Sequence, residues 1–271
     1  MKAEPKSIFT QINKAMTKYL EFKELHNQTQ PLIIGNVWNV QSAKIYEKLN
    51  FQAIGTSSAA IAHSLGYEDG EQMPFSDLLF IVERIINNVT LPLSVDIEFG
   101  YGKTATEITN NIQALQKLGV VGINIEDSLI ENGERKLNDS SQFSNLLKEV
   151  KAILIENEIS LFINVRCDAF LLNIQNTLQV ASERIINYEQ AGADGIFLPC
   201  ITQESDILKI ISQIKIPLNV MCMPQLPNFE KLEKLGVKRI STGNYLNNYA
   251  YSSLEKMITK ILTEQSFNAL F

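Results

Sequence analysis

The chain has 271 residues, of which 45% are hydrophobic, 20% charged and 8% aromatic. This composition lies near the globular average, and it excludes a disordered, collagen-like or disulfide-stapled protein. At about 150 residues per domain, the length allows either two domains or one α/β barrel.

The charge balance is 24 basic against 30 acidic residues, and no cluster of Lys or Arg stands out. We therefore expect neither nucleic acid nor a membrane as a partner. Cys167, Cys200 and Cys222 form no CxxC pair and no metal-ligand spacing, as expected of free thiols in a reducing compartment. No apolar run approaches about 18 residues and charges interrupt the N-terminus, so we expect a cytoplasmic protein with no transmembrane span or secretory signal.

Short, β-branched apolar runs alternate with longer segments of helical period along the whole chain. A first helix, from Ser7 to about Leu25, precedes them. The expected strands are 31–37, 53–56, 93–97, 121–125, 161–165, 195–198, 218–221 and 238–241. The expected helices are 40–49, 58–65, 75–87, 104–118, 141–157, 176–190, 206–214, 228–235 and 245–262.

This order predicts a single closed (β/α)8 barrel of the TIM type. The strands are almost wholly apolar, which indicates a parallel sheet covered on both faces. Gly or Asn follows the helix at four joints, KLNFQAIG, KLGVVGIN, QAGADGIF and KLGVKRIS, where a left-handed residue reverses the chain. The alternative, an open doubly wound sheet, is weakened by the absence of GxGxxG. The barrel would occupy residues 31–271, and residues 1–30 would form a helical extension that either caps the barrel bottom or mediates oligomer contacts.

Active sites of such barrels lie at the C-terminal ends of the strands. Two successive expected strands end there in acids, which are Asp96, Glu98, Glu126 and Asp127. Clustered buried carboxylates need a cation, and oxygen-only ligands select a hard metal such as Mg²⁺. The alternative is that these acids form rim salt bridges with Lys103, Arg135 or Lys136.

Six segments, in order, are similar to the isocitrate lyase and phosphoenolpyruvate mutase superfamily. They are GNVWNVQSAKIYEKLNFQAIGTSSAAIAHSLGYEDG (35–70), VDIEFGYG (95–102), GINIEDS (122–128), INVRCDAF (163–170), PLNVM (217–221) and LGVKRISTG (235–243). The resemblance implies a Mg²⁺-dependent barrel, with Mn²⁺ as the alternative ion. It also implies a homo-oligomer, a dimer of dimers whose last helix is exchanged between subunits, acting on a small 2-oxo or dicarboxylic acid.

Carried over by motif, the resemblance implies a metal site. Asp96 would hold the ion directly, and Asp69, Glu98 and Glu126 would act largely through its bound waters. Asp69 would also belong to the catalytic set.

The same motifs imply a substrate site. The backbone N–H groups of Ser57 and Ser58 would face a developing enolate oxygen, and Arg166 would bind the substrate carboxylate. Trp38 would line the pocket, and Asn219 matches an Asn that these enzymes keep after the seventh strand.

Three departures narrow the activity. Lyases of this family carry a gating loop after the fourth strand with Lys-Lys-Cys-Gly-His or Lys-Arg-Cys-Gly-His, but here SLIENGERKLNDSS (128–141) holds no Cys or His. Cys200 stands after Pro199, where the methylisocitrate-cleaving enzymes have Glu. The Lys-Thr-Asn of the phosphonomutase branch is also absent.

We therefore expect cleavage of a carbon–carbon bond in a small 2-oxo, oxaloacetate-like, or 2-hydroxy dicarboxylic acid, through an enolpyruvate-type enolate. Loss of CO₂ from a metal-chelated 2-oxo acid needs stabilisation of the enolate but no initial proton removal, so a missing loop acid is tolerable. One alternative is a phosphoenolpyruvate phosphonomutase or phosphonopyruvate hydrolase at the same site. Another is a barrel that binds a 2-oxo acid or a protein partner without catalysis.

Overall fold

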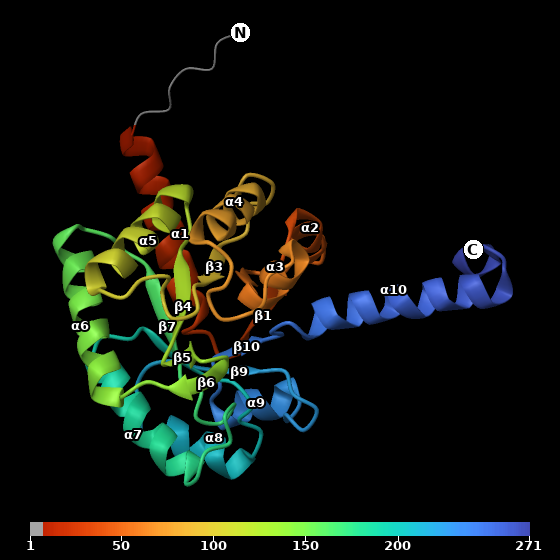
Figure 1. Cartoon of the computed structure of the whole chain (residues 1–271). Coiled ribbons are helices and arrows are strands. Elements are labelled where there is room, and N and C mark those ends of the chain that lie inside the picture. Colours follow the sequence, from red (N-terminus) through yellow and green to blue (C-terminus); the bar gives the residue numbers. More distant parts are fainter. Residues whose placement is uncertain (1–7) are drawn as a thin grey trace.

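The computed structural model describes residues 8–271, with side chains from residue 17 onward; the expected helix start at Ser7 lies outside this range. A parallel sheet closes into a barrel in the order β1-β10-β9-β8-β7-β4-β3-β2, with helices around it (Figure 1). The single (β/α)8 barrel is confirmed, and the open sheet is excluded. The barrel strands are β1 Leu32–Val37, β2 Ile54–Thr56, β3 Leu93–Asp96, β4 Gly122–Glu126, β7 Phe162–Arg166, β8 Gly195–Leu198, β9 Leu218–Met221 and β10 Arg239–Ser241.

The helices lie close to their expected ranges, with the largest departure at α8. They are α1 Ile8–Leu25, α2 Val40–Lys48, α3 Ser58–Leu65, α4 Phe75–Ile86, α5 Ala105–Leu118, α6 Ser140–Glu156, α7 Thr177–Gln190, α8 Glu204–Ile211, α9 Phe229–Leu235 and α10 Tyr245–Glu264, followed by the short 3₁₀ helix η1 Asn268–Leu270. The four reversing joints are confirmed, because Asn50, Gly119, Gly192 and Gly236 have φ values of 59°, 102°, 99° and 92°. None of the described helices is long and apolar enough to span a bilayer.

Helix α1 closes the barrel at the N-terminal ends of its strands. Its Phe22 packs edge-on against Phe162 at 5.7 Å between ring centroids, and His26 stacks on the same ring at 4.3 Å. Phe22 and Phe162 belong to a small buried cluster with the strand residues Leu32, Ile34, Ala53 and Val121. Of the two roles expected for this helix, the structure therefore shows the cap.

We expect His26 to make stability fall in mild acid. Its ring is 2% exposed, Nδ1 lies 2.9 Å from the carbonyl oxygen of Phe22, and burial lowers its pKa from 6.5 to about 3. The unfolded chain therefore binds a proton below pH 6.5 that the folded chain binds only near pH 3. Stability should drop by up to ~1.4 kcal/mol per pH unit within this window. Thermal unfolding of wild type and His26→Gln from pH 7 to 4.5 checks this; parallel pH curves would contradict it.

The segment after β4 differs from the expected loop, because it forms a hairpin of β5 Ser128–Glu131 and β6 Glu134–Leu137. Asn132 and Gly133 make the turn with φ of 53° and 81°. Two positive φ values are what a tight two-residue hairpin turn requires, and Asn-Gly is its strongest sequence signal. This signal could have predicted the hairpin.

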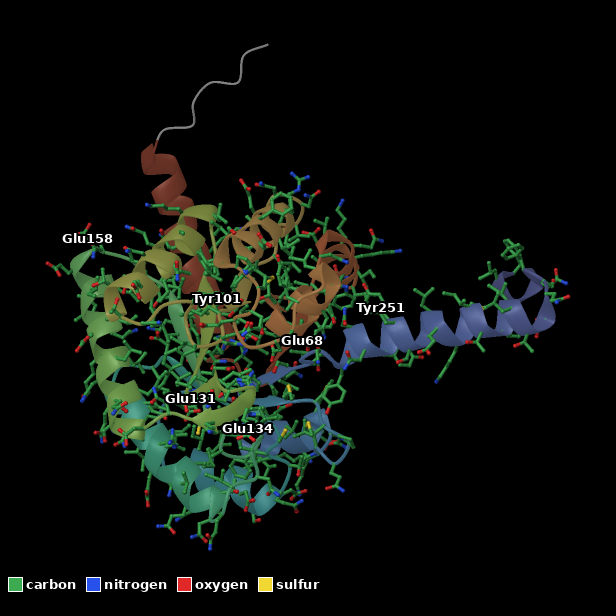
Figure 2. All side chains as sticks on the ribbon, viewed as in Figure 1. Glu68, Tyr101, Glu131, Glu134, Glu158 and Tyr251 are labelled. Carbon is green, nitrogen blue, oxygen red and sulfur yellow. The ribbon has the colours of Figure 1, made fainter. Side chains whose placement is uncertain are left out.

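Helix α10 runs away from the barrel as a projecting arm with no other described helix beside it except η1 at its end (Figure 1). Asn247 is its only buried residue. Along the arm, Tyr251 and other large side chains stand in the open (Figure 2). Those side chains include Tyr249, Tyr251, Leu254, Ile258 and Leu262.

Candidate active site

A cavity of about 210 Å³ opens at the C-terminal ends of the barrel strands, where the fold predicts a site. This volume is below the roughly 300–1,000 Å³ of sites for drug-sized ligands, so the cavity suits a small ligand. One part of its wall is apolar and consists of Leu171, Phe197, Pro199 and Met221. The rest is polar and includes Asn36, Ser57, Ser58, Asp69, Asp96, Asn124, Arg135, Arg166, Ser241 and Asn244.

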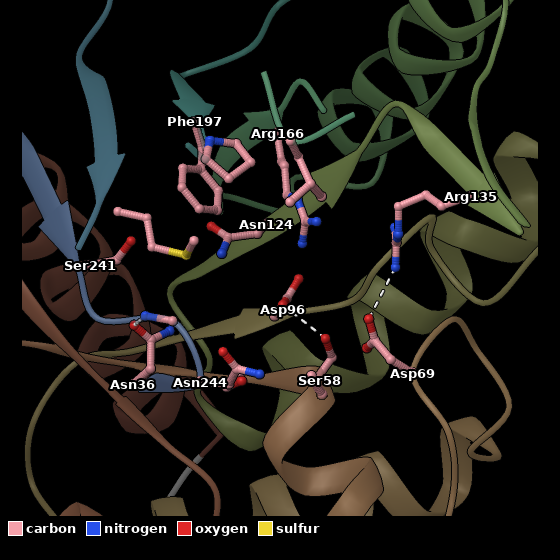
Figure 3. Close-up of a pocket in the computed structure, with 16 residues that line it drawn as sticks. Asn36, Ser58, Asp69, Asp96, Asn124, Arg135, Arg166, Phe197, Ser241 and Asn244 are labelled. Atoms are coloured by element: carbon pink, nitrogen blue, oxygen red, sulfur yellow. Dashed lines mark hydrogen bonds and ion pairs between the residues drawn. The ribbon is translucent and has the colours of Figure 1, made fainter. Parts of the chain in front are cut away.

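The cavity brings together five of the residues expected from the sequence: Ser57, Ser58, Asp69, Asp96 and Arg166. They come from the ends of β2, β3 and β7, from the start of α3 and from the loop after it. Figure 3 shows the Arg166 guanidinium facing Asp96, with Ser58 and Asp69 beside it.

Four expected residues lie elsewhere. Trp38 is half-buried against the core next to β1, and Asn219 lies in the barrel interior, where its Nδ2 donates to Ser241 Oγ at 3.1 Å. Glu98 and Glu126 line a smaller neighbouring cavity instead. The residues expected to bind metal therefore divide between two adjacent cavities.

The start of α3 corrects the expected pair of N–H donors. The Ser57 N–H donates to the Val37 carbonyl at 3.1 Å, and the Ser57 hydroxyl caps the helix by accepting from the Ala60 N–H at 3.3 Å. The amides of Ser58 and Ala59 open the helix, where no intrahelical acceptor exists. Ala59 lines the cavity, so the pair that fits is Ser58 and Ala59, one residue further along.

Asp96 lies at the floor of the cavity. Its Oδ2 accepts from Ser58 Oγ at 3.0 Å, and its N–H donates to Thr56 Oγ1 at 2.8 Å. Burial raises the pKa of Asp96, and the Asp69 charge adds to this, while Arg166 opposes it. The fold thus holds this carboxylate at a free-energy cost, which indicates a site for a positive group.

Arg166 is held by acids on two sides. Its Nε and Nη2 donate to the two carboxylate oxygens of Asp168 at 2.6 and 3.2 Å, and Nη1 lies 2.9 Å from Glu126 Oε2. The guanidinium carbon of Arg166 lies over the Phe197 ring, 6.0 Å from the ring centroid. This fork is pre-oriented, and its remaining Nη hydrogens can meet a ligand carboxylate in the cavity.

A buried network fixes Asp168 in turn. Asp168 accepts from Ser128 Oγ at 2.5 Å, and its N–H donates to Asp127 Oδ1 at 2.9 Å. Asp127 accepts from Arg184 Nη1 at 2.8 Å and from the Tyr188 hydroxyl at 2.7 Å. Asp127 therefore supports the site from behind.

Glu98 is fixed by a strained backbone. Its φ is 51°, which is uncommon for a residue with a side chain. Its carboxylate accepts from the Glu71 N–H at 2.7 Å and from the Tyr101 hydroxyl at 3.1 Å. Burial, together with the charges of Asp69 and Asp96, raises the pKa of Glu98 to about 8.

Arg135 pairs with the acids, as one of the sequence alternatives states. Its Nη2 lies 3.0 Å from Asp69 Oδ2, and Nη1 contacts Glu126 Oε1. Lys136, on the same hairpin, pairs instead with Glu134 at 3.9 Å. Rim pairing thus occurs for Arg135, although it does not involve Asp96.

The donor set fits a hard divalent ion. Asp69 Oδ1 is buried and has no hydrogen-bond partner among the described residues, and Asp96 offers a second carboxylate in the same cavity. Within the described chain, no group of three or more His, Cys, Asp or Glu residues is arranged to hold an ion.

Two polar residues of the cavity, Asn36 and Asn124, were missed, and so was Ala59, which contributes a backbone N–H. Asn36 accepts from the Thr242 and Gly243 N–H groups, both at 2.9 Å, and so fixes the loop after β10. Asn124 stands two residues before Glu126 on β4. A polar residue at every second position of an apolar strand faces the barrel interior, and this signal could have identified both asparagines.

Comparisons of the sequence with known proteins identify a family and several relatives. The family model for phosphoenolpyruvate phosphomutase matches residues 22–262. An uncharacterized protein of Mycobacterium tuberculosis is 31% identical over 83% of this chain and 82% of its own length. The 2-methylisocitrate lyase of Shewanella oneidensis is 28% identical over 82% and 77%, and the oxaloacetate decarboxylase of Ectopseudomonas mendocina is 28% identical over 85% and 78%.

Among solved structures, a phosphonopyruvate hydrolase in complex with oxalate and Mg²⁺ has a TM-score of 0.81. It is 21% identical, and the match covers 93% of this chain and 89% of that one. At this identity it supports the fold alone. The family model matches most of the chain, so the chain belongs to the phosphoenolpyruvate phosphomutase family, which confirms the resemblance, and it is an enzyme.

Proposed function

We propose that the protein is a lyase or decarboxylase that breaks a carbon–carbon bond in a small 2-oxo, oxaloacetate-like, or 2-hydroxy dicarboxylic acid. The observation that carries this proposal is the small cavity in which Arg166 faces Asp96 and the first-turn amides of α3. Relatives named 2-methylisocitrate lyase and oxaloacetate decarboxylase support it.

The chemistry follows from the donors. Arg166 would bind the substrate carboxylate, which orients the scissile bond. In an oxaloacetate-like 2-oxo acid, CO₂ would leave as that bond breaks, and the bonding electron pair would form the carbon–carbon double bond of an enolate. The negative charge would pass to the former keto oxygen, which the Ser58 and Ala59 N–H groups would stabilise. A proton from solvent then yields the 2-oxo acid product.

We also propose a Mg²⁺ or Mn²⁺ ion at this site. Asp96 would hold it directly, and Asp69, Glu98 and Glu126 would hold it through water. When bound, such an ion polarises the keto oxygen of a 2-oxo acid and lowers the cost of the enolate. The unpartnered Asp69 Oδ1 and the raised pKa of Asp96 support this placement.

The test is an assay of 2-oxo acid release, with Mg²⁺ and with EDTA: pyruvate from oxaloacetate, the corresponding longer 2-oxo acid from its 3-alkyl analogues, and any 2-oxo acid from 2-hydroxy dicarboxylates. We expect turnover that EDTA abolishes and added Mg²⁺ restores. Turnover of no 2-oxo or 2-hydroxy dicarboxylate would contradict the proposal. Turnover that survives EDTA would contradict the metal alone.

The second candidate is phosphonate chemistry, as a phosphoenolpyruvate phosphonomutase or phosphonopyruvate hydrolase at the same cavity. The match of the phosphomutase family model over residues 22–262 favours it. It predicts turnover of phosphonopyruvate, seen by ³¹P NMR as loss of the phosphonate signal. The hairpin sequence, which lacks Lys-Thr-Asn, counts against it.

We further propose a homo-oligomer, a dimer of dimers, in which α10 packs on a second copy, and a cytoplasmic enzyme whose barrel, residues 31–271, carries the catalysis. Tyr251, Leu254, Ile258 and Leu262 recur at helical spacing on an arm with almost no contact to its own barrel. The three unbridged thiols support a reducing location.

Light scattering after gel filtration tests the arm. Changing Leu254, Ile258 and Leu262 together to Glu should reduce the particle to the mass of one chain, 30.5 kDa. Lys256→Glu, an exposed charge change on the same helix, serves as the control and should leave the mass of the assembly unchanged. A wild-type particle of one chain would contradict the proposal.

A further inference from the structure

The Arg135 guanidinium lies among three carboxylates. Its Nη2 is 3.0 Å from Asp69 Oδ2, and its Nη1 contacts Glu126 Oε1 and lies 3.5 Å from Asp168 Oδ2. Nη1 also donates to Ser128 Oγ at 2.9 Å. Two of these acids, Asp69 and Glu126, belong to the proposed metal site.

The position of Arg135 on the hairpin explains this contact. Residues 131–134 around the turn are exposed, yet the Arg135 side chain is only 16% exposed. Successive side chains of a strand point to opposite faces, so Arg135 reaches inward and Lys136 outward. Arg135 therefore brings a positive charge into the site on a segment that is not part of the barrel.

Arg135 and a divalent ion need the same acids. Arg166 already neutralises much of Asp168, to which it donates two hydrogen bonds. Asp69 contacts Arg135 Nη2, whereas Glu126 is shared, because its Oε1 contacts Arg135 and its Oε2 lies 2.9 Å from Arg166 Nη1. An ion held through these acids would lie close to the guanidinium, and the repulsion between them is strong in a poorly solvated site.

We propose that Arg135 is a tethered cation that neutralises Asp69 and Glu126 in the metal-free protein and competes with a divalent ion for them. The inference rests on the metal site of the proposed function. It makes binding of free metal weaker than the carboxylates alone would allow. When an ion occupies the site, Arg135 gives up at least part of its contact with these two acids.

Mn²⁺ binding to the full chain, followed by the electron paramagnetic resonance signal of free Mn²⁺, tests this without any substrate. Arg135→Gln should bind Mn²⁺ at least about tenfold more tightly, because a charge within hydrogen-bond reach of a ligand is removed. Arg135→Lys should lie between Arg135→Gln and wild type. Lys136→Gln removes the same charge from the other face of the hairpin and should match wild type.

Adding Asp96→Asn to Arg135→Gln should abolish the gain, which places the ion at this cavity. Equal Mn²⁺ affinity of Arg135→Gln and wild type would overturn the inference while leaving the proposed function intact. Absence of Mn²⁺ binding by every variant would instead remove the metal from the proposed function, and this inference with it.

Thermal unfolding gives a second readout, which is how the effect of Arg135→Gln on the unfolding temperature depends on Mn²⁺. A merely structural salt bridge would not produce this dependence. In EDTA, Arg135→Gln should unfold at a lower temperature than wild type, because Asp69 loses its ion pair with Arg135 and Glu126 keeps only that with Arg166. Saturating Mn²⁺ should erase this difference, since the ion takes the place of the guanidinium. A difference that persists in Mn²⁺ would overturn the inference.

Discussion

Replacing Asp96 with Asn is expected to lower kcat/KM for the 2-oxo acid substrate by about 10³-fold or more. The change removes the negative charge of the carboxylate that is proposed to hold the metal ion in the cavity. The fold should survive, because the amide oxygen of Asn can still accept from Ser58 Oγ. Stability in EDTA should rise, because burial and the Asp69 charge raise the pKa of Asp96, and the neutral side chain avoids both costs. Steady-state kinetics and thermal unfolding of the same preparation measure the two effects.

Asp206→Asn provides the matched control, since Asp206 lies in the first turn of α8 and does not line the cavity. It should change neither kcat/KM nor Mn²⁺ binding. Full activity of Asp96→Asn would mean that the reaction does not pass through this carboxylate. A loss of both activity and folded structure would make the kinetic result a stability effect instead.

Arg166→Lys is expected to lower kcat/KM by about 10²–10³-fold, mainly through KM for substrate, because a single ammonium cannot reproduce the planar fork. Here the effect on stability should have the opposite sign to that of Asp96→Asn. Asp168 and Glu126 would keep a positive neighbour but lose the paired hydrogen bonds, at a cost of about 1–3 kcal/mol. Initial rates over a range of substrate concentrations and urea unfolding measure these quantities.

Arg84→Lys, on the exposed face of α4, makes the same substitution away from the cavity and should leave both quantities unchanged. If Arg166→Lys lowered kcat and left KM unchanged, Arg166 would act on the transition state rather than in substrate binding. An unchanged kcat/KM would remove Arg166 from the site altogether.

The sequence predicted the barrel well because its evidence is local and repeated. Each apolar run followed by a helical period marks one unit, and the left-handed joints at Asn50, Gly119, Gly192 and Gly236 mark where units meet. The hairpin after β4 was missed because each of its two strands has only four residues. Only the Asn132–Gly133 turn reveals it.

The site was predicted less completely, because a motif names a segment and not the direction of each group in it. In Thr56–Ser57–Ser58 the chain changes from strand to helix, and the Ser57 N–H is still used by the strand, through Val37. The available donors thus start one residue later than expected. Which acids Arg135 would reach depends on how the hairpin folds back over the barrel, and no local pattern encodes that.

The β5–β6 hairpin is a separate two-stranded sheet that is not part of the barrel sheet. Ser128 pairs with Leu137 at its base, while Glu131 and Glu134 beside the turn, both labelled in Figure 2, are exposed. Residues inserted at the turn would leave this base closed, and each doubling of the loop length costs only about 0.6 kcal/mol. The acids on β3 and β4 would keep their places while the inserted residues formed a different entrance to the cavity. Changes in the length of this hairpin could therefore alter the substrate specificity in small steps without unfolding the barrel.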